Sequence, residues 1–192
     1  QRLEAAKQPF FSVYISFAPH YPYHDYGPEW KVARGDTRLS QYVNNLRLLD
    51  AQIEKIFTAL KNRGILDNTV VVIAGDHSEA FYQHKGNFIH SLFSYEENLA
   101  VPALIHYPAG ILPQQVSRVT THADLGPTVL DLLKIRHAPG DFQGESLLRP
   151  ENREQVFAYG NEGTVSVYGK DGVKLQLMKS GACQVFDLKT DS

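Results

Sequence analysis

The stretch TVVVIAGDH at residues 69–77 decides the fold prediction. Its first seven residues form an uninterrupted, mostly β-branched apolar run, which is typical of a strand covered on both faces of a parallel sheet. Asp76 and His77 follow directly, and ligands of open α/β sheets bind outside the carboxyl ends of the strands. A carboxylate and a neutral imidazole suit one divalent ion, Ca, Mn or Zn. Two ligands do not complete a site, and the structural alternative is that Asp76 caps a turn while His77 is a surface loop residue.

A second strand is predicted at residues 10–18 (FFSVYISFA), which are aromatic and β-branched. It stops at a proline, and His20 follows. In a parallel sheet the carboxyl ends of both predicted strands meet at one edge. We therefore expect His20 to lie close to His77.

A long amphipathic helix is predicted between these strands. Apolar residues recur at three- and four-residue steps from position 39 to position 60. Asp36 or Thr37 is the expected N-cap, and Gly64 the expected end. Asp50 falls beside the apolar stripe, so we expect a structural role for it.

The rest of the chain predicts a change of architecture near residue 139. A strand at 101–107 and a short helix at 124–133 complete an α/β pattern, with a mostly parallel sheet and flanking helices, over residues 1–138. Residues 139–192 predict a small antiparallel β subdomain. Its expected strands are 156–161, 164–169, 173–178 and 185–188.

Composition excludes several classes of protein. With 43% hydrophobic and 21% charged residues, the 192-residue chain is expected to be globular and to form one domain or most of one. A net charge of −2 gives no basic stripe for nucleic acid. No apolar stretch approaches the ~20 residues of a membrane helix. The single cysteine, Cys183, excludes an internal disulfide, and the chain, which does not begin with Met, is expected to be part of a longer protein.

A loop after Asp76-His77 carries two further histidines, His84 and His90, with Lys85 beside the first. Imidazoles near a metal can hold an anionic oxygen or protonate a leaving group. A lone loop histidine is more often solvated, but four histidines converging on one carboxylate favour a site.

The other polar residues are expected to be structural or exposed. Glu79 is expected to anchor the loop, and the Glu96-Glu97 pair to form a solvated turn. Three further histidines show no clustering: His106, His122 and His137.

Five blocks together resemble the C-terminal half of the sulfatase-like branch of the alkaline phosphatase superfamily. They are residues 10–22 (FFSVYISFAPHYP), 42–60 with Asp50, 66–79 (LDNTVVVIAGDHSE), the loop 84–90 with Glu96-Glu97-Asn98 and Val101-Pro102, and 121–135 (THADLGPTVLDLLKI). The ending VFDLKTD at 185–191 also looks like the closing segment of sulfatases. Asp-His after a strand is a weak signal alone, whereas the ordered set is specific.

The resemblance implies a metal-dependent hydrolase that cleaves sulfate or phosphate esters of small molecules, lipids or glycans through a metal-bound nucleophile. It implies one divalent ion and an extracytoplasmic or membrane-associated location, with a membrane anchor possible upstream. The motif positions imply metal ligation by Asp76 and His77, catalytic contacts from His20 and His90, and substrate binding by His84 and Lys85.

Two departures from the family pattern are visible. The N-terminal half, which carries the nucleophile and the remaining acidic ligands in relatives, lies outside this chain, so the chain alone is expected to be inactive. In addition, Ser78, Tyr82 and Ile89 stand where relatives commonly have Gly, which allows backbone conformations that larger residues disfavour.

Three alternatives stay open. One is a membrane-tethered phosphoethanolamine or phosphoglycerol transferase, which shares the Asp-His pattern. Another is a non-catalytic scaffold that binds an anionic glycan or lipid. The last is a flavodoxin-like binding module, although no Gly-rich phosphate loop follows any predicted strand.

Overall fold

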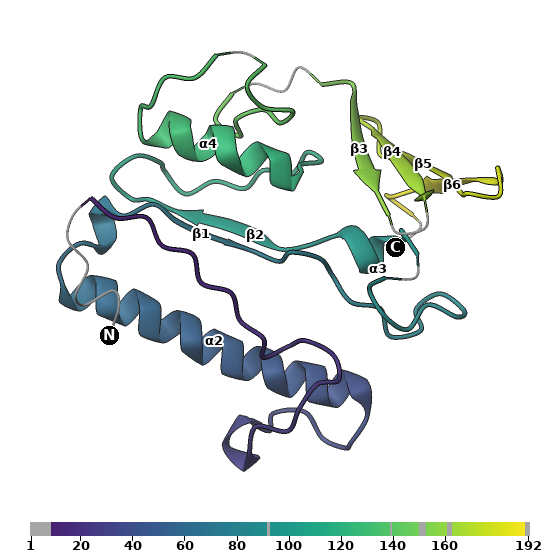
Figure 1. Cartoon of the computed structure of the whole chain (residues 1–192), viewed down its shortest axis with the longest axis horizontal. Coiled ribbons are helices and arrows are strands. Elements are labelled where there is room, and N and C mark those ends of the chain that lie inside the picture. Colours follow the sequence, from purple (N-terminus) through teal and green to yellow (C-terminus); the bar gives the residue numbers. More distant parts are fainter. Residues whose placement is uncertain (1–8, 92, 139, 150–152, 161–162, 191–192) are drawn as a thin grey trace. The chain divides into compact units, whose positions relative to one another are not determined.

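The computed structural model describes residues 9–91, 93–138, 140–149, 153–160 and 163–190. The chain divides into two compact units, Gln1–Thr69 and Val70–Ser192, which are described separately (Figure 1). The boundary expected at residue 139 falls on a residue outside the described ranges. That division stays a prediction.

The first unit is built on the long helix α2, Arg38–Asn62. The Oγ1 of Thr37 accepts the backbone N–H of Ser40 at 3.1 Å, which caps the first turn. After the helix, Gly64 adopts φ 66° and donates its N–H to Lys61, as in helix ends that use a left-handed residue. The predicted helix and its Thr37 cap are confirmed. Two short 3-10 turns flank α2: η1, Pro28–Trp30, and η2, Leu66–Asn68.

The strand predicted at residues 10–18 is wrong, because this segment forms no strand. A strand needs the backbone of a neighbour to complete its hydrogen bonds, and no described residue of the first unit supplies one. The segment is tied to α2 by a hydrogen bond from the Ser16 Oγ to the Gln52 Oε1 at 2.9 Å. Most of its apolar side chains stay exposed, Phe11 to 90%, although Ala18 is buried.

In the second unit, strands β1, Val71–Ala74, and β2, Ala103–His106, pair with each other. Both lie inside the predicted strand ranges. They run antiparallel, whereas a parallel arrangement was expected. A parallel pair needs a crossover connection, usually a helix, and the chain between β1 and β2 holds only the four-residue helix α3, Glu96–Leu99, among its described residues.

The helix predicted at residues 124–133 is confirmed as α4, Leu125–Leu132, which follows the 3-10 turn η3, His122–Asp124. Asp124 is fully buried. Its carboxylate accepts the backbone N–H groups of Thr121 and Glu145, both at 2.8 Å, and a guanidinium N–H of Arg153 at 2.9 Å.

The small antiparallel sheet predicted near the C-terminal end is also confirmed. Strands β3, Gln155–Tyr159, β4, Val165–Gly169, β5, Val173–Leu177, and β6, Cys183–Asp187, form one meander in chain order (Figure 1). The face with Val156, Tyr168 and Lys174 is buried, while the opposite face exposes apolar side chains such as Phe157 and Val185.

None of the helices in the described ranges is both long enough and apolar enough to cross a membrane.

Candidate active site

Asp76 and His77 leave the end of β1 as a pair whose geometry suits a shared cation. The Oδ1 of Asp76 accepts the His77 backbone N–H at 3.1 Å. The His77 Nδ1 lies 2.9 Å from the carbonyl oxygen of Ser78. Because a carbonyl can only accept, Nδ1 carries the proton and Nε2 holds the lone pair of the neutral ring. That nitrogen lies 3.8 Å from the Asp76 Oδ2.

These two atoms fit the divalent ion expected from the sequence. Ligand atoms each about 2 Å from one ion lie at most about 4 Å apart, and the observed separation of 3.8 Å is within that limit. A backbone carbonyl that holds the other ring nitrogen, as Ser78 does for His77, is the usual support of a metal-binding histidine. Among the described residues, no group of three or more His, Cys, Asp or Glu side chains is placed to hold an ion by itself.

His90 lies against this pair and is held by Glu79. The rings of His77 and His90 stack with their centroids 3.9 Å apart. Glu79 is buried, and its carboxylate accepts the backbone N–H of His90 at 2.5 Å and the ring Nδ1 at 3.2 Å. These contacts confirm the anchoring role expected for Glu79. They also fix Nδ1 as a donor, which directs the reactive chemistry of the ring to Nε2.

His84 is held in a similar way by Glu97. Its Nδ1 donates to the Glu97 Oε1 at 2.8 Å, and its ring stacks on Tyr95 with centroids 3.9 Å apart. Burial opposes ionisation of Glu97, but hydrogen bonds from Asn87 and His84 outweigh it and hold the pKa of Glu97 below its usual value. The solvated turn expected at Glu96-Glu97 is therefore wrong. The Glu97 side chain is only 10% exposed, because it faces the histidine loop.

Two buried asparagines, which the sequence interpretation missed, shape the loop between His84 and His90. Asn87 donates to the Asn98 Oδ1 at 2.6 Å and to the Glu97 Oε1 at 2.7 Å. Asn98 donates to the carbonyl oxygen of Ile89 at 3.1 Å. Single asparagines in irregular segments carry no periodic signal, so the sequence could not single them out.

Tyr82, one of the residues in place of the expected glycines, has φ 67°. Left-handed backbone costs a non-glycine residue about 1–2 kcal/mol. The conformation is held by a hydrogen bond from the Tyr82 N–H to the carbonyl oxygen of Asn87 at 2.7 Å and by stacking on Phe88. The loop therefore keeps the glycine-like backbone at this position despite the larger side chain.

The remaining candidates are placed as follows. Lys85 is exposed in the loop next to His84. His20 belongs to the first unit, where its Nδ1 donates to the carbonyl oxygen of Tyr21 at 2.6 Å. His77, His84 and His90 belong to the second unit, so the convergence of His20 with them stays a prediction.

Two of the histidines assigned to structural roles do have structural contacts. The His122 Nε2 donates to the carbonyl oxygen of Gly75 at 2.6 Å and so supports the backbone just before Asp76. The His137 Nε2 donates to the Asp131 Oδ1 at 3.0 Å.

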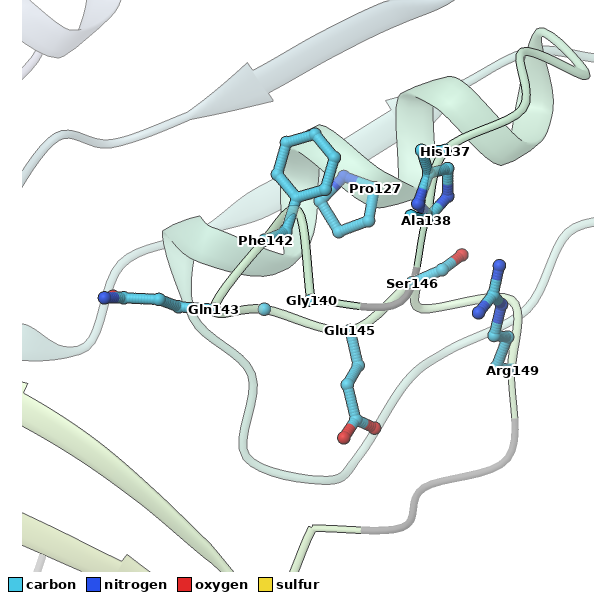
Figure 2. Close-up of a pocket in the computed structure, with 10 residues that line it drawn as sticks. Pro127, His137, Ala138, Gly140, Phe142, Gln143, Glu145, Ser146 and Arg149 are labelled. Carbon is cyan, nitrogen blue, oxygen red and sulfur yellow. The ribbon is translucent and has the colours of Figure 1, made fainter.

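A hollow of about 330 Å³ lies beside α4 and the loop that follows it (Figure 2). Two of the side chains that line it, His137 and Arg149, donate hydrogen bonds to the carboxylate of Asp131. Hydrogen bonds from Ser146, His137 and Arg149 hold the pKa of Asp131 below its usual value, against the effect of burial. The residues that line the hollow include none of the candidate catalytic side chains. We assign this cluster to the structure of the loop.

The Asp-His pair and the histidine loop lie within a region of the chain that matches a known family. The profile described as Sulfatase aligns with residues 1–135. The chain belongs to the sulfatase family. This membership shows the resemblance inferred from the five sequence blocks to be correct.

Relatives within and around the sulfatase family include both hydrolases and synthases. Lipoteichoic acid synthase 2 of Bacillus subtilis (strain 168) is 29% identical over 164 residues, which cover 80% of this chain and 25% of that protein. Arylsulfatase K of Bos taurus is 36% identical over 99 residues, 52% of this chain and 18% of that protein. The chain thus spans about a quarter or less of the length of these two relatives.

A solved structure supports the fold of this sulfatase-family chain. A protein of the alkaline phosphatase superfamily from Vibrio parahaemolyticus superimposes with a TM-score of 0.69 at 21% identity, and the match covers 99% of this chain and 44% of that chain. The mixed α/β architecture with its small antiparallel sheet is therefore shared with that structure.

Proposed function

We propose that this chain supplies the histidine-bearing part of a metal-dependent hydrolase that cleaves sulfate or phosphate esters. The observation that carries the proposal is the Asp76-His77 pair, whose Oδ2 and Nε2 atoms are 3.8 Å apart, with the His90 ring stacked on His77. The nucleophile and the other ligands would come from parts of the protein outside this chain.

The metal, held by Asp76 and His77, would polarise the ester and stabilise negative charge. His90 would bind the leaving-group oxygen through Nε2 and give it a proton. Glu79 would stabilise the positive charge of that ring and keep Nε2 directed at the substrate. His84 and Lys85 would bind oxygens of the anionic group, and His20 would contact the same group.

A second candidate function is transfer of a phosphorylated lipid head group by a membrane-tethered enzyme. It is favoured by the match to lipoteichoic acid synthase 2, which covers more of this chain than the match to arylsulfatase K. The two functions differ in the acceptor, which is water in the hydrolase and a lipid or polymer hydroxyl in the transferase. A third candidate is a non-catalytic, anion-binding scaffold, for which the full-length protein would show no ester turnover.

The test uses the full-length protein and two variants, His77→Ala and His90→Ala, with the exposed His24→Ala as control. Hydrolysis of p-nitrophenyl sulfate and p-nitrophenyl phosphate, and transfer from phosphatidylglycerol, are each measured. We expect at least one activity in the wild type and the control, and a loss of about 100-fold or more in both variants. His77→Ala should also lower the bound metal measured by mass spectrometry. Full activity in both variants, or no activity in the wild type with any ester, would contradict the proposal.

A further inference from the structure

Lys174 in β5 is almost completely buried, with 1% of its side chain exposed. A lysine is rarely so buried unless it is paired. Its Nζ donates to the carbonyl oxygen of Ser94 at 2.5 Å and to the Glu96 Oε1 at 2.8 Å. Burial lowers the pKa of Lys174, and the Glu96 carboxylate opposes that shift. The hydroxyl of Tyr168 in β4 donates to the same Glu96 oxygen at 2.7 Å.

Residues 94–97, to which Lys174 donates its hydrogen bonds, also contact His84 of the histidine loop. Glu96 is the first residue of α3, and the next residue, Glu97, accepts the proton-bearing Nδ1 of His84. Tyr95, between the Ser94 carbonyl and Glu96, stacks on His84 and contacts the ring of Phe186 in β6 edge-on at 5.9 Å. The meander and the histidine loop are therefore joined through a few consecutive residues.

A four-residue helix has almost no stability of its own. The orientation of α3, and with it the direction in which Glu97 points, must come from tertiary contacts. Lys174 supplies two of them from one atom, which fixes both the first residue of α3, Glu96, and the carbonyl of Ser94, two residues before it. An apolar side chain of the same volume could fill the space but could not fix the position of the Ser94 carbonyl and the Glu96 carboxylate.

We propose that Lys174 is a positioning residue, which sets the orientation of His84 through Glu96 and Glu97 and so couples the C-terminal meander to the active site. The inference rests on the proposed function, since it assumes that His84 binds the anionic group. It assigns a functional role to a strand far from the Asp-His pair in sequence, since positions 77 and 174 are 97 residues apart.

A double-mutant cycle in the full-length protein tests this coupling. Lys174→Met, His84→Ala and the double variant are compared with the wild type by kcat/KM on the ester that the wild type turns over. We expect Lys174→Met to lower kcat/KM about tenfold in the wild-type background and less than about twofold in the His84→Ala background. A role limited to stability would lower activity by the same factor in both backgrounds.

Two further variants keep the test decisive. Lys170→Met removes a lysine from the same hairpin whose partner, Glu154, is exposed, and it should leave kcat/KM unchanged. If Lys174→Met does not fold, Glu96→Gln replaces it, because this variant keeps the side-chain volume and should show the same dependence on His84. If His84→Ala leaves kcat/KM unchanged, the substrate-binding role of His84 in the proposed function is refuted. A strong effect of His84→Ala together with a Lys174→Met effect that is additive or absent would overturn the positioning role alone.

Discussion

The carboxylate of Glu79 holds His90 at two points, the backbone N–H and the ring Nδ1, across 11 residues of chain. The position of the backbone and the rotation of the ring are therefore set by one buried group. An apolar side chain in place of Glu79 would fix neither the backbone position nor the ring rotation of His90, because it accepts no hydrogen bonds. Together with the stacking of the ring on His77, Glu79 therefore sets where the His90 Nε2 points.

Glu79→Ala should lower ester turnover of the full-length protein about 10- to 100-fold, because the ring loses its orientation and its charge partner. Metal content should be unchanged, since Asp76 and His77 do not depend on Glu79 for their contacts with each other. The measurements are kcat/KM and bound metal, with the exposed Glu154→Ala as the matched control. Wild-type turnover in Glu79→Ala would show that His90 needs no such support.

The elements with strong local signals could be predicted from the sequence. The periodic helix α2 with its Thr37 cap, the strands β1 and β2, helix α4 and the four-stranded meander all lie where the patterns place them. In each case the period or the turn residues are local properties of the chain. The antiparallel pairing of β1 with β2 could not be read in this way, because β-branched runs do not encode the direction of the partner strand.

In the candidate site, the sequence could predict only the residues whose side chains can bind a metal or an anion. Asp76 and His77 stand out in the sequence because they directly follow a predicted strand, and His84 and His90 because they cluster in the loop after it. What holds them was not predictable: Glu97 was expected in solvent, and the Asn87–Asn98 pair was overlooked. Side-chain hydrogen bonds across a loop depend on its three-dimensional path, for which a single sequence gives no signal. The apolar run at residues 10–18 shows the same limit, since β propensity does not supply a strand partner.

Ionisation of Glu97 should contribute to stability in a pH-dependent way. Its pKa in the folded protein lies below the usual value of 4.5. The folded state therefore binds this proton less readily than the unfolded state. The contribution of the Glu97 carboxylate to the free energy of unfolding is complete above pH 4.5 and is lost as the pH falls through the pKa of the folded state. Urea unfolding of the wild type and Glu97→Gln should differ most near pH 7, and the difference should shrink below pH 4.5.

Asp67→Asn, which alters an exposed carboxylate, is the control for the Glu97 titration. Its unfolding free energy should follow that of the wild type across the same pH range. A constant gap between the wild type and Glu97→Gln from pH 7 to pH 3 would contradict the assigned pKa direction.

Removal of the metal should destabilise the full-length protein only when Asp76 and His77 are intact. A bound ion stabilises the folded state in proportion to the logarithm of its concentration relative to Kd. After treatment with a chelator, adding Mn, Zn or Ca should raise the Tm of the wild type, and Asp76→Asn should lose most of that rise. The measurement is thermal unfolding against metal concentration, with Asp141→Asn as an exposed-carboxylate control. Equal metal-dependent shifts in the wild type and in Asp76→Asn would place the ion elsewhere.

The fully buried carboxylate of Asp124 should be the most sensitive stability position of the second unit. Removing one partner of a buried ion pair leaves the other charge uncompensated, at a cost of about 3–5 kcal/mol. Asp124→Ala leaves the positive charge of the Arg153 guanidinium without its partner. It also removes the acceptor for the backbone N–H groups of Thr121 and Glu145. Asp124→Ala combined with Arg153→Met should recover part of the loss, because the second change removes the unpaired charge and leaves only the two N–H groups without an acceptor. Urea unfolding measures both variants, and a double variant less stable than Asp124→Ala alone would mean that Arg153 stabilises this region independently of the ion pair.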